Sequence, residues 1–573
     1  MRGIDAAIVA AIAAFAILLM ARSGARRGVE LMPWPDGLEY AAQAVNLDRG
    51  MGPVLHFGGY SYPSRYPEGY PLILAAAFPM VGHEVSRLFL ATMSMGVVAI
   101  VGLYVLAFKL FGRASATAAA LVLCLSPVFL TYSTLVLSDV PTLAVTILAA
   151  LALAHASTQE DNSISARSLA TWLLFGLLAG FTVMIRPTNG TMLAGLALGL
   201  LLVPPKRGLL AAFVALIAFG AGFIVPIGIQ AASNSAHLGS VFASGYGWWV
   251  PEVYGTAGRT FSPAYLFGPT LPRNPHGNIP VYVTSLLGLD GMLGDRGDLR
   301  FFIYPFAAAA FGAIGIAFVI RERESRMARR VVLFGLGYLG ALFAIYAVYM
   351  FTDVAFILPG AFVIFLGAGY GITAGNRWMR AAFGNSRRNA ASTAGAVGIL
   401  LLDLLLVISL LTEGGSRLAA NPAESEMVPA LETLNQSVPP DATIVTNISL
   451  QFMELYLPGK SRRFIGMNAL DPGERFTDYH LRRLYEKQAS GWNGAAPAIL
   501  FANDNVSQPV LDSLTSASRG APVLLVLAAP ESAAYADTLK HELDALQQSF
   551  KIEPLGESRA MAIYQLTPLN PAH

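Results

Sequence analysis

The sequence predicts a multi-span α-helical membrane protein with a soluble α/β domain at its C-terminal end. Of its 573 residues, 55% are hydrophobic and only 13% are charged, whereas an ordinary soluble domain carries roughly 25% charged residues. Long apolar segments recur as far as residue 411, and short apolar strands and an amphipathic helix follow. We therefore expect a transmembrane domain at 1–411 and a soluble domain at 412–573.

The apolar segments have the lengths of membrane spans. A hydrocarbon core about 30 Å thick requires about 20 mostly apolar residues per helix. Residues 4–21 could instead be a signal peptide, because small residues follow at 21–25, but Asp5 and the length of the run favour a span. Several segments are rich in Gly and Ala, which favours close helix packing in lipid. We expect eleven spans, at about 4–21, 87–108, 114–131, 140–156, 169–185, 190–203, 209–230, 301–320, 331–350, 355–373 and 391–411.

Lys and Arg residues predict the orientation, because cytoplasmic loops carry an excess of them. One set of short loops is basic and includes "RERESRMARR" at 321–330. The opposite set contains the long segments 22–86 and 231–300 together with the C-terminal region. We therefore expect a multi-pass protein of the cytoplasmic (inner) membrane, with its N-terminus inside and its C-terminal domain outside.

The C-terminal region has the pattern of a soluble α/β domain. Its expected strands are 442–447, 497–503, 522–528 and 560–566, and its expected amphipathic helix is 533–550. It contains no Gly-rich phosphate loop and no Cys/His metal-ligand spacing, so its sequence assigns it no chemistry. The net charge of +2 gives no reason to expect a nucleic-acid partner, because such binding needs clustered cationic surface.

The first outer loop begins with "WPDGLEYAAQAVNLDRG" at 34–50. Asp36 and Glu39 have the spacing of a capping box, in which both side chains bond backbone N–H groups. The helix that follows carries Leu38 and Val45 on one side and Gln43 elsewhere, as expected for a helix along the membrane interface. Asp36 is therefore either a helix cap or a carboxylate available for proton transfer at the membrane surface.

The second part of this loop is "SYPSRYPEGYPLILA" at 61–75. Its Pro and Tyr residues favour turns and an interfacial position. Further along, Asp139 and Arg186 lie at the outer ends of two predicted spans. Asp139 is either a helix cap or a functional carboxylate. Arg186 either extends towards the lipid headgroups or binds a phosphate through its planar donors.

These segments together resemble the GT-C-fold family of glycosyltransferases that use lipid-linked sugars, particularly the protein mannosyltransferase and aminoarabinose transferase branch. That family has an Asp in the first outer loop, a short interfacial helix, and a "PPxYPxLLA"-like entry into the second span. A second family motif resembles "YSTLVLSDVPTLAVTILAALA" at 132–152, which contains Asp139. The residues that match the first motif here are Asp36, Tyr40, Ala44, Leu47, Gly50 and "YPEGYPLILA" at 66–75.

The sequence departs from the family pattern at three places. The paired acidic residues of the family's first outer loop are not adjacent here but appear as Asp36 and Glu39. Pro67-Glu68 stands where the family has two prolines. In the segment 351–369, Ala355 stands where an Arg is usual. We therefore expect another residue to hold a phosphate there, such as Arg259, Arg273 or Arg300.

The resemblance implies inverting transfer of a hexose or pentose from a polyprenyl-phosphate donor to a glycan, lipid or protein acceptor at the outer membrane face. It assigns no cofactor and leaves a divalent metal open. His237 and His276 are weak evidence for a metal site, because they lack metal-ligand spacing. Two other functions stay open: a transporter or flippase of lipid-linked sugars, and a non-catalytic scaffold that binds cell-envelope polymer. Asp36 is the expected catalytic base, and the expected substrate-binding residues are Glu39, Tyr40, Arg65, Tyr66, Glu68, Asp139 and Arg186.

Overall fold

The computed structural model describes most of the predicted membrane domain and most of the C-terminal domain. Every predicted span contains helix except 391–411, which lies outside the described residues together with the predicted domain boundary at 411/412. In the described part, six helices are long and apolar enough to cross a membrane, and shorter apolar helices accompany them. The described residues are 3–24, 35–159, 165–204, 208–271, 274–287, 306–321, 325–383, 427–458, 462–468, 479–502, 505–530, 532–558 and 560–569.

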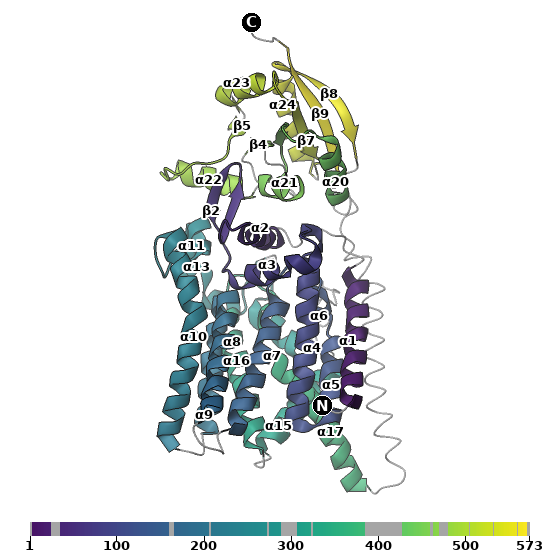
Figure 1. Cartoon of the computed structure of the whole chain (residues 1–573), viewed down its shortest axis with the longest axis vertical. Coiled ribbons are helices and arrows are strands. Elements are labelled where there is room, and N and C mark those ends of the chain that lie inside the picture. The colour runs from purple at the N-terminus through teal and green to yellow at the C-terminus, as the bar shows by residue number, and fades with distance from the viewer. Residues whose placement is uncertain are drawn as a thin grey trace.

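The membrane helices form a bundle, and the C-terminal domain stands at one end of it (Figure 1). The predicted span 114–131 is interrupted, because Ser126 caps a new helix and Pro127 cannot continue the previous one. The helices are α1 (Gly3–Gly24), α4 (Phe89–Phe111), α5 (Arg113–Cys124), α6 (Pro127–Tyr132), α7 (Asp139–Gln159), α8 (Ala166–Ile185), η2 (Pro187–Thr191), α9 (Met192–Leu202), α10 (Gly208–Leu238), α15 (Phe306–Arg321), α16 (Arg326–Ala347) and α17 (Phe362–Phe383).

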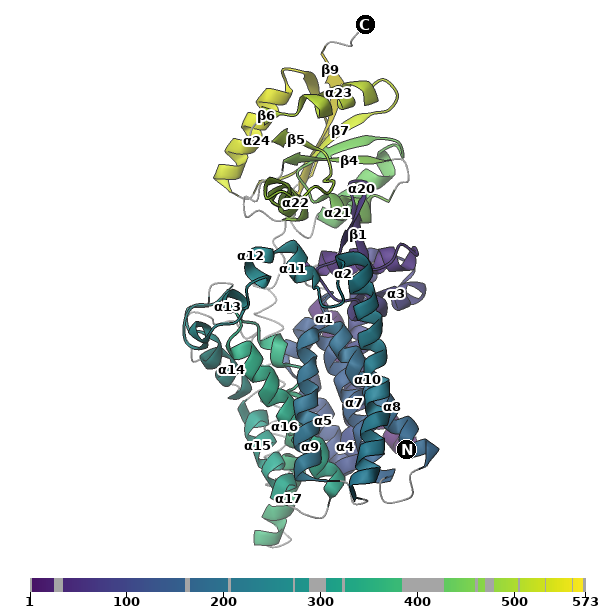
Figure 2. The ribbon, with the colours of Figure 1, turned by 90° about the vertical axis from the view of Figure 1, so that its left-hand side faces the viewer.

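Glycines bring neighbouring helices into backbone contact. Helix α10 runs along α8 (Figure 2). A Cβ atom at Gly176 would lie 2.0 Å from the carbonyl oxygen of Phe219, and one at Gly180 would lie 2.4 Å from that of Phe223. Only glycine fits at such distances, which agrees with the close packing expected from small residues in lipid.

Several connecting segments, which we call the outer loops after their predicted orientation, lie between the bundle and the C-terminal domain (Figure 1). The first outer loop contains α2 (Asp36–Asp48), a hairpin of β1 (Val54–Phe57) and β2 (Tyr60–Pro63), then α3 (Gly69–Val81) and η1 (Val85–Arg87). The second long outer region contains α11 (Gly245–Trp249), α12 (Pro251–Tyr254), α13 (Ala257–Thr260), η3 (Pro263–Leu266) and α14 (Asn278–Leu287), and η6 (Val354–Ile357) precedes α17.

The C-terminal domain has a seven-stranded sheet in the order β6-β5-β4-β3-β7-β9-β8, with β3, β4, β5 and β7 parallel. The four predicted strands correspond to β3, β5, β7 and β9, whereas the predicted helix 533–550 ends at Leu546 because strand β8 begins at Phe550. The elements are α20 (Met427–Ser437), β3 (Thr443–Thr446), α21 (Leu450–Tyr456), β4 (Arg463–Asn468), α22 (Tyr479–Ala489), β5 (Ile499–Ala502), β6 (Asn505–Val506), α23 (Gln508–Ala517), β7 (Val523–Ala528), α24 (Ala533–Leu546), β8 (Phe550–Glu557) and β9 (Met561–Pro568).

The two faces of this sheet pack against different partners, because successive strand residues point to opposite faces. Val445 and Leu525 pack with α23 and α24 in a core of the domain itself. Ile444 and Leu524 belong to a second core that also contains Tyr40 of α2. The C-terminal domain therefore shares a continuous apolar core with the first outer loop.

This packing changes the surroundings that the sequence predicts for α2. The sequence predicts a helix along the membrane interface with Gln43 away from its apolar side, but Gln43 and Asn46 are both buried. The amide oxygen of Gln43 accepts a hydrogen bond from the Ser64 hydroxyl at 3.0 Å, and Asn46 Nδ2 donates to the Val54 carbonyl at 2.7 Å. The cause is tertiary, because α21 of the C-terminal domain also packs against α2.

Candidate active site

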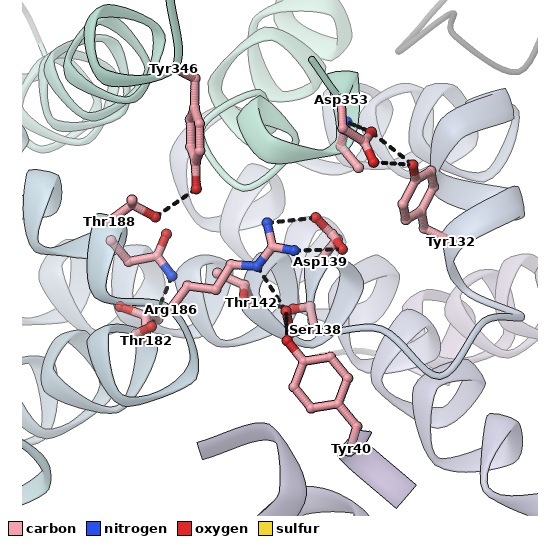
Figure 3. Close-up of polar contacts among 12 residues, drawn as sticks. Tyr40, Tyr132, Ser138, Asp139, Thr142, Thr182, Arg186, Thr188, Tyr346 and Asp353 are labelled. Carbon is pink, nitrogen blue, oxygen red and sulfur yellow. Dashed lines mark hydrogen bonds and ion pairs between the residues drawn. The ribbon is translucent and has the colours of Figure 1, made fainter. Parts of the chain in front are cut away.

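Arg186 lies at the C-terminal end of α8, where Pro187 follows and the helix ends. A residue that precedes proline prefers extended backbone, and Arg186 has φ −145° and ψ 119°. Its side chain is only 17% exposed and forms a double ion pair with Asp139, from Nη1 to Oδ1 at 2.8 Å and from Nη2 to Oδ2 at 3.0 Å (Figure 3). This inward position differs from that of an Arg that extends towards lipid headgroups.

The residues at the start of α7 hold this ion pair. Ser138 precedes the helix, and its carbonyl accepts the hydrogen bond of the Thr142 N–H. Arg186 Nε donates to the Ser138 hydroxyl oxygen at 2.8 Å, and the Tyr40 hydroxyl donates to the same oxygen at 3.2 Å. Through Ser138, the ion pair at the ends of two spans is joined to helix α2 of the first outer loop (Figure 3).

Asp353 provides a further carboxylate beside this ion pair (Figure 3). It accepts hydrogen bonds from the Tyr132 hydroxyl at 2.7 Å and from the Ala355 N–H at 2.9 Å. Burial raises the pKa of Asp353, although both hydrogen bonds and the charge of Arg186 act in the opposite direction. The ring of Phe356, in the same turn, lies 5.2 Å from the Arg186 guanidinium.

A second cluster of charges lies on α2 and on the loop before α3. Arg65 Nη2 lies 3.0 Å from Asp36 Oδ1 and 2.7 Å from Glu39 Oε1. Glu39 is fully buried and Arg65 is 11% exposed, whereas the Asp36 side chain is 40% exposed. Glu39 Oε1 also lies 3.0 Å from His480 Nε2, on α22 of the C-terminal domain. Asp36 is thus the open end of a chain of charges that is otherwise closed off from solvent.

The capping box expected at the start of α2 is wrong. The N-cap position is held by Pro35, no side chain caps the helix, and Asp36 is its first residue. The Glu39 N–H bonds to the Pro35 carbonyl instead. The physical reason is that the guanidinium of Arg65 attracts both carboxylates more strongly than the neutral backbone N–H groups do.

Two glycines allow the loop that carries Arg65 to lie against neighbouring backbone segments. A Cβ atom at Gly69 would lie 2.6 Å from the backbone nitrogen of Ile185, the last residue of α8. A Cβ atom at Gly245 would lie 1.9 Å from the carbonyl oxygen of Ser64. These contacts bring the loop to the end of α8, which Arg186 directly follows.

Tyrosine rings occupy the space between the two charge clusters. The ring of Tyr40 lies 4.4 Å from that of Tyr66 and 4.8 Å from that of Tyr70, measured between centroids. The Arg65 guanidinium lies 4.8 Å from the Tyr66 ring. Of the expected substrate-binding residues, the structure therefore gathers Glu39, Tyr40, Arg65, Tyr66, Asp139 and Arg186 with Asp36.

Glu68 lies apart from these residues. Its backbone N–H donates to Gln230 Oε1 of α10 at 3.1 Å. Burial raises the pKa of its carboxyl group, and a hydrogen bond with Ser233, also on α10, acts in the opposite direction. The structure therefore directs Glu68 towards α10 and away from the two charge clusters.

Comparisons with known proteins show which fold the chain has. The sequence model of the dolichyl-phosphate-mannose-protein mannosyltransferase family matches residues 66–228. The crystal structure of ArnT from Cupriavidus metallidurans bound to undecaprenyl phosphate has 14% sequence identity and a TM-score of 0.59, covering 96% of this chain and 97% of ArnT. The chain has the GT-C fold.

A second GT-C structure matches over nearly the whole chain. The archaeal oligosaccharyltransferase AglB from Archaeoglobus fulgidus, in complex with an inhibitory peptide and a dolichol-phosphate, has 12% identity and a TM-score of 0.53. The match covers 99% of this chain and 75% of AglB. No curated protein sequence matches the chain.

Metal-ligating side chains are the next feature of this GT-C chain, considered over the described residues alone. Among them, no three His, Cys, Asp or Glu side chains are grouped to hold one. Asp36 and Glu39 come close together, but both bond the Arg65 guanidinium. A cation of the protein, the Arg65 guanidinium, therefore already lies between these two carboxylates.

Of the replacement phosphate ligands expected from the sequence, only Arg259 is described, and it is not gathered with the other site residues. Arg259 is exposed and donates to the Glu252 carbonyl at 3.2 Å, while Arg273 and Arg300 lie outside the described residues. The outer-loop pair Trp248–Trp249 packs at the boundary of the two domains, where Trp249 Nε1 donates to the Pro63 carbonyl at 2.8 Å.

Sequence reasoning missed two parts of the site in this GT-C chain. His480 follows no motif and lies in a domain to which the sequence assigns no chemistry. Tyr132 and Asp353 lie in segments that the family resemblance covers, but their contact joins residues far apart in the chain. The signal for Asp353 was its place at the start of a segment similar to a late family motif.

Proposed function

We propose that the chain is a membrane glycosyltransferase that moves a sugar from a polyprenyl-phosphate donor to an acceptor hydroxyl, with inversion at the anomeric carbon. The support comes from the GT-C fold together with the geometry of Asp36. Of the carboxylates in the two charge clusters, Glu39 and Asp139 are 0% and 1% exposed, whereas the Asp36 side chain is 40% exposed. Asp36 can therefore be reached by an acceptor.

The position of Asp36 suits a general base. Arg65 Nη2 bonds one oxygen, Oδ1, and so fixes the orientation of the carboxylate. Among the described side chains, this contact with Arg65 leaves the other oxygen, Oδ2, open to an acceptor. A positioned carboxylate of this kind can accept a proton from a hydroxyl that approaches within hydrogen-bond distance.

The Arg186 guanidinium is suited to bind the phosphate that leaves the sugar donor. Arg186 has five N–H donors. Three of them contact Ser138 and Asp139, and the guanidinium also has a hydrogen bond with the Tyr346 side chain. The donor that remains can bond a phosphate oxygen, and the pairing with Asp139 holds the fork in one orientation. A preorganised cation stabilises the charge that develops on a leaving phosphate.

The proposed reaction balances with these two groups. The acceptor oxygen attacks the anomeric carbon while its proton moves to Asp36. The bond between the anomeric carbon and the phosphate oxygen breaks, and its electron pair stays on the polyprenyl phosphate. The new glycosidic bond lies on the opposite face of the sugar, and the Asp36 proton returns to solvent through its exposed side.

The proposed location follows from the distribution of basic residues. The described helix ends that carry Lys109, Arg113, Arg167 and Arg326 lie at the end of the bundle away from the C-terminal domain (Figure 1). By the positive-inside rule, this distribution supports a site and a C-terminal domain on the outer face of the cytoplasmic membrane. The acceptor is a glycan, lipid or protein of that compartment.

The test is Asp36→Asn, with Asp48→Asn at the end of the same helix as a matched control. Asn keeps the size of Asp and can still bond Arg65, but it cannot accept the proton. With purified protein and polyprenyl-phosphate sugars, we expect Asp36→Asn to lower turnover by about 10²–10⁴-fold at unchanged thermal stability. Asp48 pairs with His83 at the surface, and its variant should keep wild-type turnover.

Two results would contradict the proposal. Turnover of Asp36→Asn within about fivefold of wild type would exclude Asp36 as the base. A deletion strain without accumulated lipid-linked sugar, together with wild-type protein that transfers no sugar from any polyprenyl-phosphate donor, would exclude the glycosyltransferase function.

A further inference from the structure

A single atom of Glu39 contacts both a residue of the first outer loop and a residue of the C-terminal domain. Its Oε1 lies 2.7 Å from Arg65 Nη2 and 3.0 Å from His480 Nε2. The side chains of Glu39 and His480 are 0% and 2% exposed. A carboxylate so far from solvent depends on partners that compensate its charge, and here one of the partners comes from a different domain.

The position of His480 is fixed by aromatic packing. Its ring lies 5.0 Å from that of Trp249 and 5.8 Å from that of Phe57, between centroids. Trp249 is itself held by its hydrogen bond to the Pro63 carbonyl. The imidazole therefore has little freedom to turn away from Glu39.

The neighbouring residue of α22 adds a second contact to the same chain of charges. The Arg65 guanidinium lies 5.4 Å from the ring of Tyr479 and 4.8 Å from that of Tyr66. One ring belongs to the C-terminal domain and the other to the loop before α3. Helix α22 thus bounds the buried end of the cluster, while Asp36 stands at its exposed end.

Other hydrogen bonds also connect the outer loops to the C-terminal domain, but they do not involve Asp36, Arg65 or Glu39. The Tyr62 hydroxyl donates to the Ala495 carbonyl at 3.0 Å, and Lys487 Nζ donates to the Trp248 carbonyl at 2.6 Å. The Gly58 N–H donates to Glu454 Oε1 at 2.6 Å. The loop and the domain are therefore joined at several points, and the contact of His480 is the one that leads through Glu39 and Arg65 to Asp36.

We propose that His480 is a positioning residue for the transfer reaction: by donating to Glu39 it fixes Arg65, and through Arg65 it orients Asp36. The C-terminal domain then completes the active site in addition to any contact that it makes with an acceptor. This inference rests on the proposed function, in which Asp36 is the base.

Arg65 divides its donors between two carboxylates, those of Asp36 and Glu39. With His480 in place, Glu39 is held from both sides, and the Arg65 fork can bond Asp36 at the same time. Without the His480 donor, Glu39 loses one of its two cationic or polar partners and draws Arg65 further towards itself. The bond to Asp36 Oδ1 then weakens, and the base loses its fixed orientation.

A matched set of variants tests whether His480 positions Asp36 through Glu39 and Arg65. His480→Gln places an amide N–H where the Nε2 donor was. His480→Asn places its amide N–H near the Nδ1 position, because the shorter Asn side chain does not reach Glu39. We expect kcat of His480→Asn to fall on the order of 10- to 100-fold, as for a misplaced catalytic group, with KM for the donor within about threefold. His480→Gln should recover kcat to within about threefold of wild type.

The control is Tyr62→Phe, which removes a hydrogen bond across the same boundary but leaves the charges intact. It should keep both kcat and KM. If Tyr62→Phe lowers kcat as much as His480→Asn does, the effect comes from docking of the domain and the inference is wrong. Equal activity of His480→Asn, His480→Gln and wild type would also overturn it.

A double-variant cycle tests whether the effect passes through Glu39. In a Glu39→Gln background, His480→Asn should cause no further loss of kcat, because the connection is already broken. Additive losses would show that His480 acts by another route and would refute the inference. If the wild-type protein transfers sugar and the His480 variants are unaffected, this inference alone is refuted. If the wild-type protein transfers no sugar, the proposed function is refuted.

Discussion

Replacement of Arg186 should separate its contribution to folding from its contribution to transfer. The Asp139 side chain is 1% exposed, so Arg186→Ala leaves a buried carboxylate without its partner. Breaking a buried ion pair in this way costs about 3–5 kcal/mol. Arg186→Lys keeps the charge but cannot bond Ser138 and both Asp139 oxygens together, and losing one charge-assisted hydrogen bond costs about 1.5–3 kcal/mol. We expect Tm in detergent to fall for both variants, more for Ala.

The double variant Asp139→Asn with Arg186→Gln distinguishes the two contributions. It replaces the ion pair by two amides that can bond each other, so no uncompensated charge is left, and we expect Tm to return close to the wild-type value. Transfer should stay lower by about 10²-fold or more, because no cation faces the leaving phosphate.

The assay measures turnover and Tm on the same purified samples. If the double variant transfers sugar within about fivefold of wild type, Arg186 serves only to join the ends of α7 and α8, and its assignment as a phosphate ligand is wrong. If Tm stays low while turnover is low, the amide pair has failed to replace the ion pair, and Arg186→Lys then decides between the two roles.

Three further predictions concern topology, pH and packing. A reporter that is active only in the cytoplasm should stay silent when fused after Pro568, and activity there would contradict the orientation. Although burial opposes ionisation of Glu39, Arg65 and His480 hold its pKa below the usual 4.5; its ion pairs therefore stabilise the fold above pH 4.5, and this stabilisation is lost as pH falls through the lowered pKa. The difference in Tm between wild type and Glu39→Gln should then narrow in acid, and a constant difference would contradict the ion pairs. Gly176→Ala should lower Tm because its new carbon would meet the Phe219 carbonyl, whereas Gly220→Ala on the facing helix meets nothing within 4 Å and should not; equal effects would contradict the packing.

Sequence patterns predicted most of the elements but not all of their ends. Apolar length is a local property, so the spans could be located from about 20 residues at a time. The interruption at Ser126 and Pro127 also has a local cause, but the apolar pattern runs through it. The helix expected to reach 550 ends at Leu546 because β8 pairs with β9 along the chain, and strand pairing is not visible in the periodicity of a helix.

Within the site, the sequence determined which residues to consider, because Asp36, Tyr40 and Asp139 lie in family motifs, Arg65 directly precedes one, and Arg186 lies at the end of a predicted span. It could not determine their partners. A capping box is judged from residues three apart, and that judgement fails when a charged side chain from another segment competes for the same carboxylates. Only the tertiary structure brings Arg65 to Asp36 and Glu39, because Gly69 and Gly245 let the loop approach other backbone segments closely. His480 reaches Glu39 because the C-terminal sheet and α2 bury apolar side chains in one shared core, and such burial depends on the packing of whole elements, which no local pattern records.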